Sequence, residues 1–183
     1  MNLKMIITTA LAMLMLSPQG LADGRSPYSG EQMREIKALS DAEVAGLLSG
    51  RGLGYAKAAE LNGYPGPAHV LELARELDLS TAQRDKTRAI FDRMQDAARK
   101  LGERMVAAER QLDQAFANKT IAERSVSELT ARIGQIEAQL REVHLQAHLD
   151  QTQLMTETQI ARYVRLRGYS DQGQGDHHHH NGE

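Results

Sequence analysis

Apolar side chains recur at intervals of three and four residues through two long stretches in the second half of the chain. The two series are Ile90, Met94, Ala97, Leu101, Met105, Ala108, Leu112 and Ala115, followed by Val126, Leu129, Ile133, Ile136, Leu140, Val143 and Ala147. Such spacing places the apolar residues on one face of an α-helix. We therefore predict one helix over residues 81–116 and a second that starts after a short turn at 117–119. Because long helices with matching apolar faces and a short connection pack antiparallel, the pattern predicts an all-α fold built on a long helical hairpin.

Capping boxes mark where the predicted helices begin. In this motif a Ser or Thr side chain accepts a hydrogen bond from the backbone three residues later, and a Glu or Gln at that position bonds back. Four segments fit the motif, namely Ser40–Glu43, Ser80–Gln83, Thr120–Glu123 and Thr156–Gln159. They predict helix starts at these points, and the last helix is expected to end at about Leu166.

Shorter helical pieces, separated by glycine and proline, precede the hairpin. The helix after the first capping box should end at Gly50, where Gly50, Gly52 and Gly54 are expected to form a flexible joint. Further short helices are expected over about 55–61 and 67–77. They flank the hairpin.

These elements divide the chain into four parts. Residues 1–22 are predicted to be a signal peptide, and residues 23–66 are short helices and loops that could dock a partner. Residues 67–167 form the hairpin domain. Residues 168–183 are rich in Gly, Gln, Asp and His, a composition that predicts a disordered tail.

The N-terminal segment has the features of an export signal. Lys4 supplies a basic start, residues 5–16 are mostly apolar, and small residues lead to Ala22, after which we predict cleavage. The alternative is an uncleaved membrane anchor, but an apolar run of about twelve residues falls short of the ~20 that a spanning helix needs. We therefore expect a periplasmic protein with no stable membrane insertion after cleavage.

Composition narrows the classes of function. The chain has 183 residues, a formal net charge of −2, no Cys and no Trp. The absence of Cys excludes a disulfide framework, a thiolate metal site and a Cys nucleophile. Interspersed charges give no basic face for nucleic acid. No nucleophile elbow, phosphate loop or metallohydrolase motif is present, so we predict no catalytic residue, no organic cofactor and no enzymatic activity.

Two of the capping boxes carry a resemblance to a known family. Leu79-Ser80-Thr81-Ala82-Gln83 and Met155-Thr156-Glu157-Thr158-Gln159 lie about 75 residues apart and flank the predicted hairpin. They resemble the paired Leu-Thr-x-x-Gln motif of the periplasmic LTxxQ family, which includes the chaperones Spy and CpxP and the heavy-metal resistance and sensor proteins ZraP and CnrX. Ser replaces Thr in the first copy and Met replaces Leu in the second. The resemblance covers residues 67–166 and implies a curved hairpin that dimerises into a cradle.

Histidines give the hairpin a candidate metal site. His144 and His148 are four residues apart, so their rings project from one helix face and can share an ion. The alternative is two polar residues at the border of a helix interface. The resemblance to the metal-sensing branch implies further ligands from His69, with Glu72 or Asp92 as an oxygen donor. Such a set suits zinc, nickel, cobalt or copper, and the residues do not choose among them.

The tail contains a second group of histidines at the end of the chain. Four consecutive histidines follow Asp176, namely His177, His178, His179 and His180. The run is shorter than a usual purification tag and continues into Asn181-Gly182-Glu183, which favours a native tail. It is either a low-specificity metal scavenger or simply a polar tail.

Two functions follow from these observations. The first is a metal-binding protein that acts in heavy-metal resistance or as a metal sensor, with an inner-membrane sensor or regulator protein as partner. The alternative is an ATP-independent chaperone or stress-response adaptor, in which Met94 and Met105 would contact unfolded clients through adaptable side chains. A homodimer is expected in either case.

Overall fold

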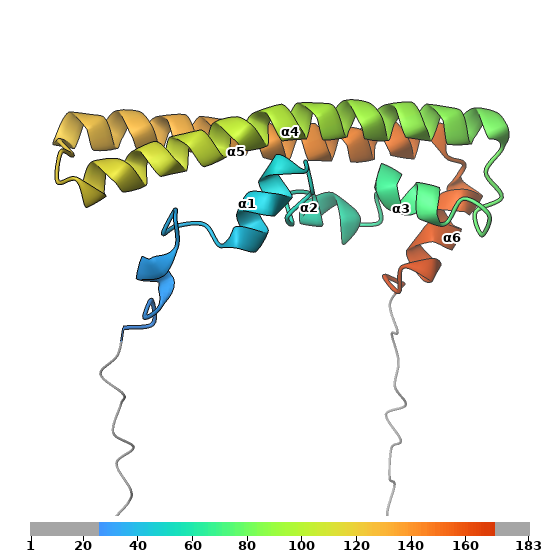
Figure 1. Ribbon diagram of the computed structural model, residues 1–183. Helices are drawn as coiled ribbons and strands as arrows, with labels where there is room; N and C mark the ends of the chain where they lie inside the picture. Colours follow the sequence, from blue (N-terminus) through green and yellow to red (C-terminus); the bar gives the residue numbers. More distant parts are fainter. Residues whose placement is uncertain (1–25, 171–183) are drawn as a thin grey trace, which may run out of the picture.

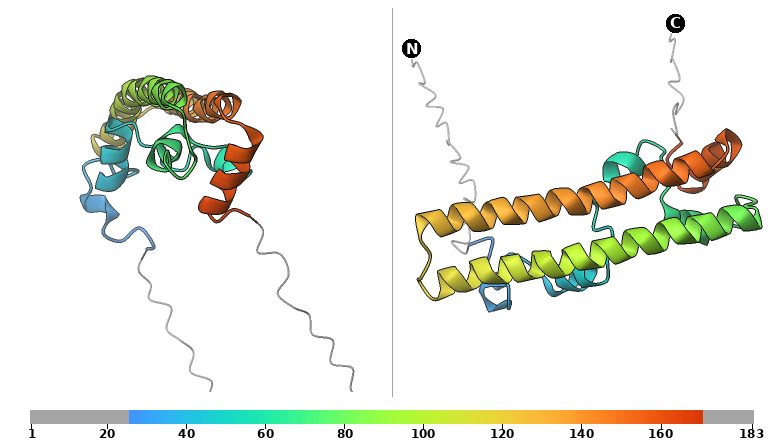
Figure 2. Two further views of the ribbon diagram at one scale, coloured as in Figure 1. Left: turned by 90° about the vertical axis from the view of Figure 1, so that its right-hand side faces the viewer. Right: turned by 90° about the horizontal axis from the view of Figure 1, so that it is seen from above.

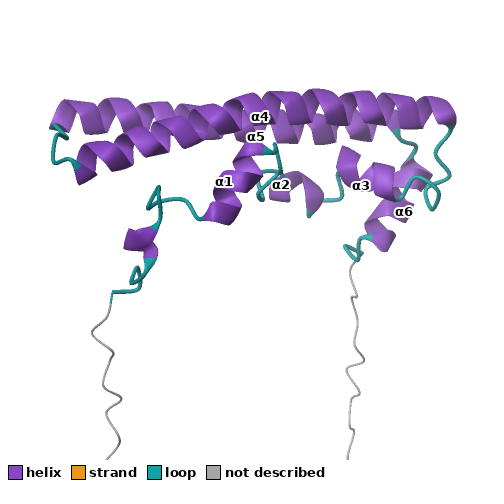
Figure 3. Ribbon diagram, viewed as in Figure 1, coloured by secondary structure: helices purple, strands orange, loops and turns teal. Residues whose placement is uncertain are grey.

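The computed structural model describes residues 26–170, and over this range the chain is helical with no strand (Figure 3). The predicted signal peptide, with its cleavage site, and His177–His180 lie outside the described residues. The elements in chain order are a 3-10 helix η1 (Glu31–Met33) and the α-helices α1 (Asp41–Leu48), α2 (Lys57–Glu60), α3 (Pro67–Glu72), α4 (Thr81–Ala117), α5 (Glu123–Leu154) and α6 (Glu157–Leu166).

The predicted helical hairpin is confirmed. Helices α4 and α5 run antiparallel along their whole length, and Figure 2 shows them side by side from above. The interface buries Met105 of α4 against Ile136 and Leu140 of α5, at relative exposures of 5%, 0% and 2%. Removal of this apolar surface from water drives the pairing of the two helices.

The two family-like motifs meet at the open end of the hairpin. Both capping boxes form, because the Ser80 and Thr156 hydroxyls accept from the backbone of Gln83 and Gln159. The two glutamine amides also bond to each other, with Nε2-to-Oε1 distances of 2.9 and 3.2 Å. Gln83 donates further to the Leu154 carbonyl, and Gln159 donates to the Leu77 carbonyl. We call this reciprocal pair the glutamine clasp.

The short helices cover one side of the hairpin. Figure 1 shows α1, α2, α3 and α6 on the same side, and Figure 2 shows α1 and α6 descending at opposite edges with α2 and α3 between them. Helix α1 packs closely on α4, because a Cβ at Gly102 would lie 2.1 Å from the Leu47 carbonyl oxygen. Helices α1 and α2 are thus engaged with the hairpin itself, whereas η1 buries no residue.

The glycine joint predicted after α1 is a turn packed against the hairpin. Gly50 adopts a φ of +70°, and a Cβ there would lie 2.7 Å from the Gln95 carbonyl oxygen of α4. Only glycine fits this close approach in a left-handed conformation. The turn carries the chain from α1 to α2.

One predicted capping box is wrong. Helix α5 begins after Ala122, which makes no side-chain cap, and the Thr120 hydroxyl donates instead to the Ala115 carbonyl at the end of α4. The Thr120 backbone N–H bonds to the same carbonyl oxygen. Thr120 therefore closes α4, and Lys119 completes the turn with a φ of +56°.

Two short helices are also shorter than predicted. Helix α2 begins at Lys57 instead of residue 55, and α3 ends at Glu72 instead of residue 77. Residues 73–78 turn so that Leu77 is buried against Tyr163 of α6 in a second apolar cluster. Asp78 then takes a φ of +49°, a conformation that ends the turn before the first motif.

In the part of the chain that the structure describes, no helix is long and apolar enough to cross a membrane.

Candidate metal centre

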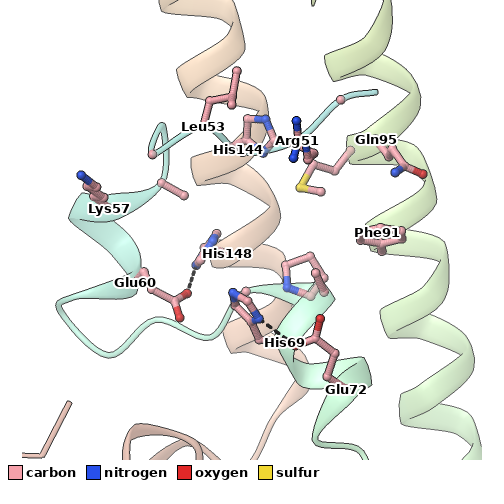
Figure 4. A pocket seen from close by; sticks show the side chains of 18 residues that line it. Arg51, Leu53, Lys57, Glu60, His69, Glu72, Phe91, Gln95, His144 and His148 are labelled. Carbon is pink, nitrogen blue, oxygen red and sulfur yellow. Dashed lines mark hydrogen bonds and ion pairs between the residues drawn. The ribbon is translucent and has the colours of Figure 1, made fainter. Parts of the chain in front are cut away.

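A pocket of about 530 Å³ lies where the α2–α3 segment meets the motif end of the hairpin. Its wall holds three of the predicted histidines and two glutamates (Figure 4), namely Glu60, His69, Glu72, His144 and His148. Apolar side chains of α4, including Phe91 and Met94, form the opposite wall. Nitrogen and oxygen donors from three separate elements therefore face one cavity.

His148 is held in one tautomer. Its Nδ1 lies 2.8 Å from the Tyr64 carbonyl oxygen and donates to it. The neutral ring then carries a lone pair on Nε2, the other ring nitrogen. Gly66 covers this edge of the ring, because a Cβ there would lie 2.8 Å from Cε1 and 3.0 Å from Nε2. Any side chain at residue 66 would therefore crowd Nε2 of His148.

His69 is oriented in the same way from the other side of the pocket. Its Nδ1 lies 3.0 Å from Oε2 of Glu72, one turn later on the same segment, and donates to that carboxylate. Nε2 of the neutral ring is again left as an electron-pair donor. A carboxylate or carbonyl behind Nδ1 is the usual outer-shell arrangement of metal-ligating histidines, and it increases the basicity of the free nitrogen.

His144 lies one helical turn before His148 and is almost fully buried, at 3% relative exposure. Burial, and then the nearby His148, lowers the pKa of His144 to about 4, so the ring is neutral near pH 7. Tyr55 stacks on it with ring planes 12° apart. Nε2 of His144 has no hydrogen-bond partner among the described residues, which is costly for a buried polar atom.

Glu60 lines the pocket and also forms hydrogen bonds with residues of α6 and the segment that follows it. Its Oε1 accepts from the Tyr163 hydroxyl at 2.7 Å, from Arg167 Nε at 3.2 Å and from the Tyr169 hydroxyl at 3.2 Å. Its Oε2 lies 3.8 Å from Nδ1 of His148. Burial and the bond to Glu60 raise the pKa of Tyr163, so this hydroxyl remains a donor.

Four of the predicted ligands thus line the same pocket, namely His69, Glu72, His144 and His148. Asp92 does not, because it is exposed and its neighbours Phe91, Met94 and Gln95 take the pocket wall on α4. Within residues 26–170 no three His, Asp or Glu side chains stand close enough together to hold a metal ion. As the side chains stand, the pocket presents oriented donors without a complete coordination shell.

Sequence reasoning missed Glu60, Tyr64 and Gly66. Each acts through a contact with a residue more than eighty positions away, and none belongs to a motif or an apolar series. The one local signal was the sequence Asn62-Gly63-Tyr64-Pro65, which predicts a turn but does not indicate what the turn approaches.

Compared with models of known protein families, with characterised proteins and with solved structures, the chain matches none of them.

Proposed function

We propose that this protein binds a divalent transition-metal ion in the pocket, and that it acts outside the cytoplasm in heavy-metal resistance or as a metal sensor. The observation that carries the proposal is the shared orientation of His69 and His148. Each ring donates through Nδ1 to a fixed acceptor, and both side chains line the same cavity.

The donor set suits zinc, nickel, cobalt or copper(II). Imidazole nitrogens bind all four ions, and the absence of thiolate removes the preference for softer metals. Glu60 and Glu72 supply carboxylates in the same pocket wall, and water would fill the other positions. His144 lines the same pocket, and its neutral ring would gain a partner by ligation.

A metal in this pocket would join two parts of the fold. His69 comes from α3 and His148 from α5, so an ion shared by them would fix the covering segment to the hairpin. Two arrangements of that segment, with and without the ion, would give a sensor its two states. The proposal includes export, as the predicted signal peptide indicates, and a homodimer, as the LTxxQ resemblance implies. It also includes an inner-membrane partner that reads the metal-bound state.

The chaperone alternative has less support. Met105, one of the two methionines expected to contact clients, is buried in the hairpin core at 5% exposure. Met94 is half-buried and faces the pocket. Neither side chain presents an open adaptable surface to an unfolded polypeptide.

The test is calorimetric titration of zinc, nickel, cobalt and copper into the full chain. The background is a tail variant that carries His177→Ala, His178→Ala, His179→Ala and His180→Ala together, so that only the pocket contributes. We expect one ion per chain for at least one metal, and at least tenfold weaker binding after His148→Ala, because a ligand is lost.

Two glycine variants provide a matched pair. Gly66→Ala keeps every ligand but places a methyl group against Nε2 of His148, whereas a Cβ at Gly52, also in the pocket wall, meets His144 only at 3.9 Å. Gly66→Ala should weaken binding like His148→Ala, and Gly52→Ala should leave it unchanged. Identical isotherms for the tail variant with and without His148→Ala would refute the proposal.

A further inference from the structure

The pocket that contains the histidines is larger than a metal ion and its water shell require. Its volume is about 530 Å³. An ion with six waters fills roughly 200 Å³, at about 30 Å³ for each water. Proteins bind small organic molecules in cavities of about 300–1,000 Å³ whose walls are mostly apolar and carry a few polar groups. The pocket therefore has room for an organic molecule beside the proposed ion.

Two cationic side chains line the same pocket and form no ion pair with a carboxylate among the described residues. They are Lys57 and Arg51, whose guanidinium donates to the Ala42 carbonyl at 3.3 Å. In Figure 4 both cations lie in the upper part of the pocket, whereas His69 and Glu72 lie in the lower part. Positive charge and metal donors thus occupy different ends of one cavity.

Apolar side chains line the pocket between these two ends. Phe91 and Met94 belong to the α4 wall, and Leu53 lies in the loop before α2. Figure 4 shows Phe91 at a level between Arg51 and His69. A carbon chain placed along this wall would remove apolar surface from water, which favours binding.

The formal charges of the lining favour a dianion once a metal ion is present. The charged lining consists of two cations and two carboxylates, namely Arg51, Lys57, Glu60 and Glu72. These charges cancel, so a divalent ion leaves an excess of two positive charges. Charges in a partly enclosed pocket interact more strongly than in bulk water. A ligand with two carboxylates would therefore balance the excess.

The protein donors also leave coordination positions for such a ligand. Nδ1 of His69 and of His148 is engaged with an acceptor, so each ring offers Nε2 alone. Within residues 26–170 no three His, Asp or Glu side chains stand close enough together to hold an ion. Zinc takes four ligands, and carboxylate oxygen is among those that it accepts. Oxygen atoms of a bound molecule can therefore complete the shell.

We infer that the pocket binds its ion together with a small organic dicarboxylate. One carboxylate coordinates the ion held by His69 and His148, and the carbon chain lies along the apolar wall of α4. The other carboxylate pairs with Arg51 and Lys57. This inference rests on the proposed function and names the second component of the ligand. The site then recognises a metal complex and not the hydrated ion alone.

The test uses glutarate and valerate, two acids of equal chain length that differ by one carboxylate. Each is titrated calorimetrically into the tail variant, loaded with whichever of zinc, nickel, cobalt and copper binds most tightly. We expect one glutarate per chain, bound at least fivefold more tightly than valerate, because only glutarate has a carboxylate for the two cations. Glutarate should bind the metal-free chain at least tenfold more weakly. Metal content after dialysis against glutarate should stay at one ion per chain.

A double variant in the same background assigns the second carboxylate. Arg51→Gln with Lys57→Gln should bind the metal ion alone with unchanged affinity, and glutarate should then bind no more tightly than valerate. Arg88→Gln with Lys100→Gln removes the same charge from exposed positions of α4 outside the pocket. This control should keep the preference for glutarate, and loss of the preference in both double variants would indicate an effect of net charge and contradict the assignment.

Other outcomes separate this inference from the proposed function. If the metal-loaded chain binds the two acids equally, if glutarate removes the ion, or if glutarate binds equally well without the ion, the inference is wrong while the metal site stands. If none of the four ions binds, or if His148→Ala leaves their binding unchanged, the proposed function fails and the inference falls with it.

Discussion

The two halves of the hairpin bury different kinds of side chain. In the turn half, formed by residues 98–117 of α4 and 123–140 of α5, the buried side chains are apolar, as Met105, Ile136 and Leu140 illustrate. In the motif half, formed by residues 81–97 and 141–154, Thr87, His144, His148 and Gln151 are buried. These four are the buried polar side chains among the described residues.

The difference separates what stabilises the fold from what equips it for a ligand. An apolar interface gains free energy in proportion to the area removed from water. A buried polar atom without a partner instead costs about 1–3 kcal/mol. Thr87, His144 and Gln151 each carry such an atom in the motif half, and His144 also lines the pocket. The buried contacts of the turn half are therefore apolar, and the motif half also retains buried polar groups that cost stability.

The largest loss of stability should follow a substitution in the apolar half of the hairpin. Ile136→Ala removes a side chain that is fully buried, so unfolding should become easier by about 3 kcal/mol. Chemical denaturation measured by circular dichroism checks this value. Ile133→Ala, a half-buried neighbour on the same cluster, should cost clearly less. Equal losses at the two positions would contradict the burial described for α5.

Burial of His144 should make the stability of the fold decrease in acid. Because the pKa of His144 is about 4 in the fold and 6.5 in the unfolded chain, the unfolded chain takes up a proton first as the pH falls. Stability is thus complete above about pH 6.5 and declines toward pH 4, by roughly 3 kcal/mol at most. Denaturation midpoints measured between pH 7.5 and 4.5 give the profile.

His144→Leu is the control for that profile. The variant removes the titrating ring and its unpartnered Nε2, so it should be at least as stable as the parent at pH 7 and lose less stability at pH 4.5. Parallel profiles for parent and variant would show that other groups cause the acid sensitivity.

The sequence predicted the long-range pairing better than it predicted the site. Helical periodicity is set by burial against the partner helix, so the series through Met105 and Ile136 predicted the hairpin directly. The spacing of His144 and His148 predicted a shared face for the same reason. Glu60, Tyr64 and Gly66 became visible only in three dimensions, because loop packing places them beside residues far along the chain.

The wrong capping box at Thr120 has an equally local explanation. A Thr three residues before a Glu fits the motif, but the preceding helix also ends there and leaves carbonyl groups without partners. The Ala115 carbonyl takes both the hydroxyl and the backbone N–H of Thr120. A capping motif describes the start of one helix only. It therefore does not predict that the end of the preceding helix competes for the same side chain.

Loss of the glutamine clasp at the motif end of the hairpin should reduce stability by a smaller amount. Gln83→Ala and Gln159→Ala should each cost about 1–2 kcal/mol, because each removes a cap and leaves amide partners unsatisfied. Since the two side chains bond to each other, the double variant should cost less than the sum, by about 1 kcal/mol. Glu43→Ala, which breaks a capping box with no such partner, should add independently to either change.

The smallest effect should appear at the turn. Lys119 adopts a left-handed conformation, so Lys119→Gly should raise stability by roughly 0.5 kcal/mol. Asp78, just before α4, has a similar φ, but Asp tolerates this region better and its carboxylate accepts from Arg162 at 2.6 Å. Asp78→Gly should bring no gain. Thermal unfolding of both variants measures the two changes in stability. An equal gain from Asp78→Gly would contradict the difference expected between the two positions.

The clasp also bears on the order of folding events. Gln83 and Gln159 are 76 residues apart and can meet only after both long helices have formed and closed at the turn. Helices form within about a microsecond, whereas contacts between distant residues come later. The clasp should therefore form after the rate-limiting step, so that its loss accelerates unfolding and leaves the folding rate unchanged. In kinetic terms it sets how long the closed hairpin survives, and it has little influence on how quickly the chain reaches that state.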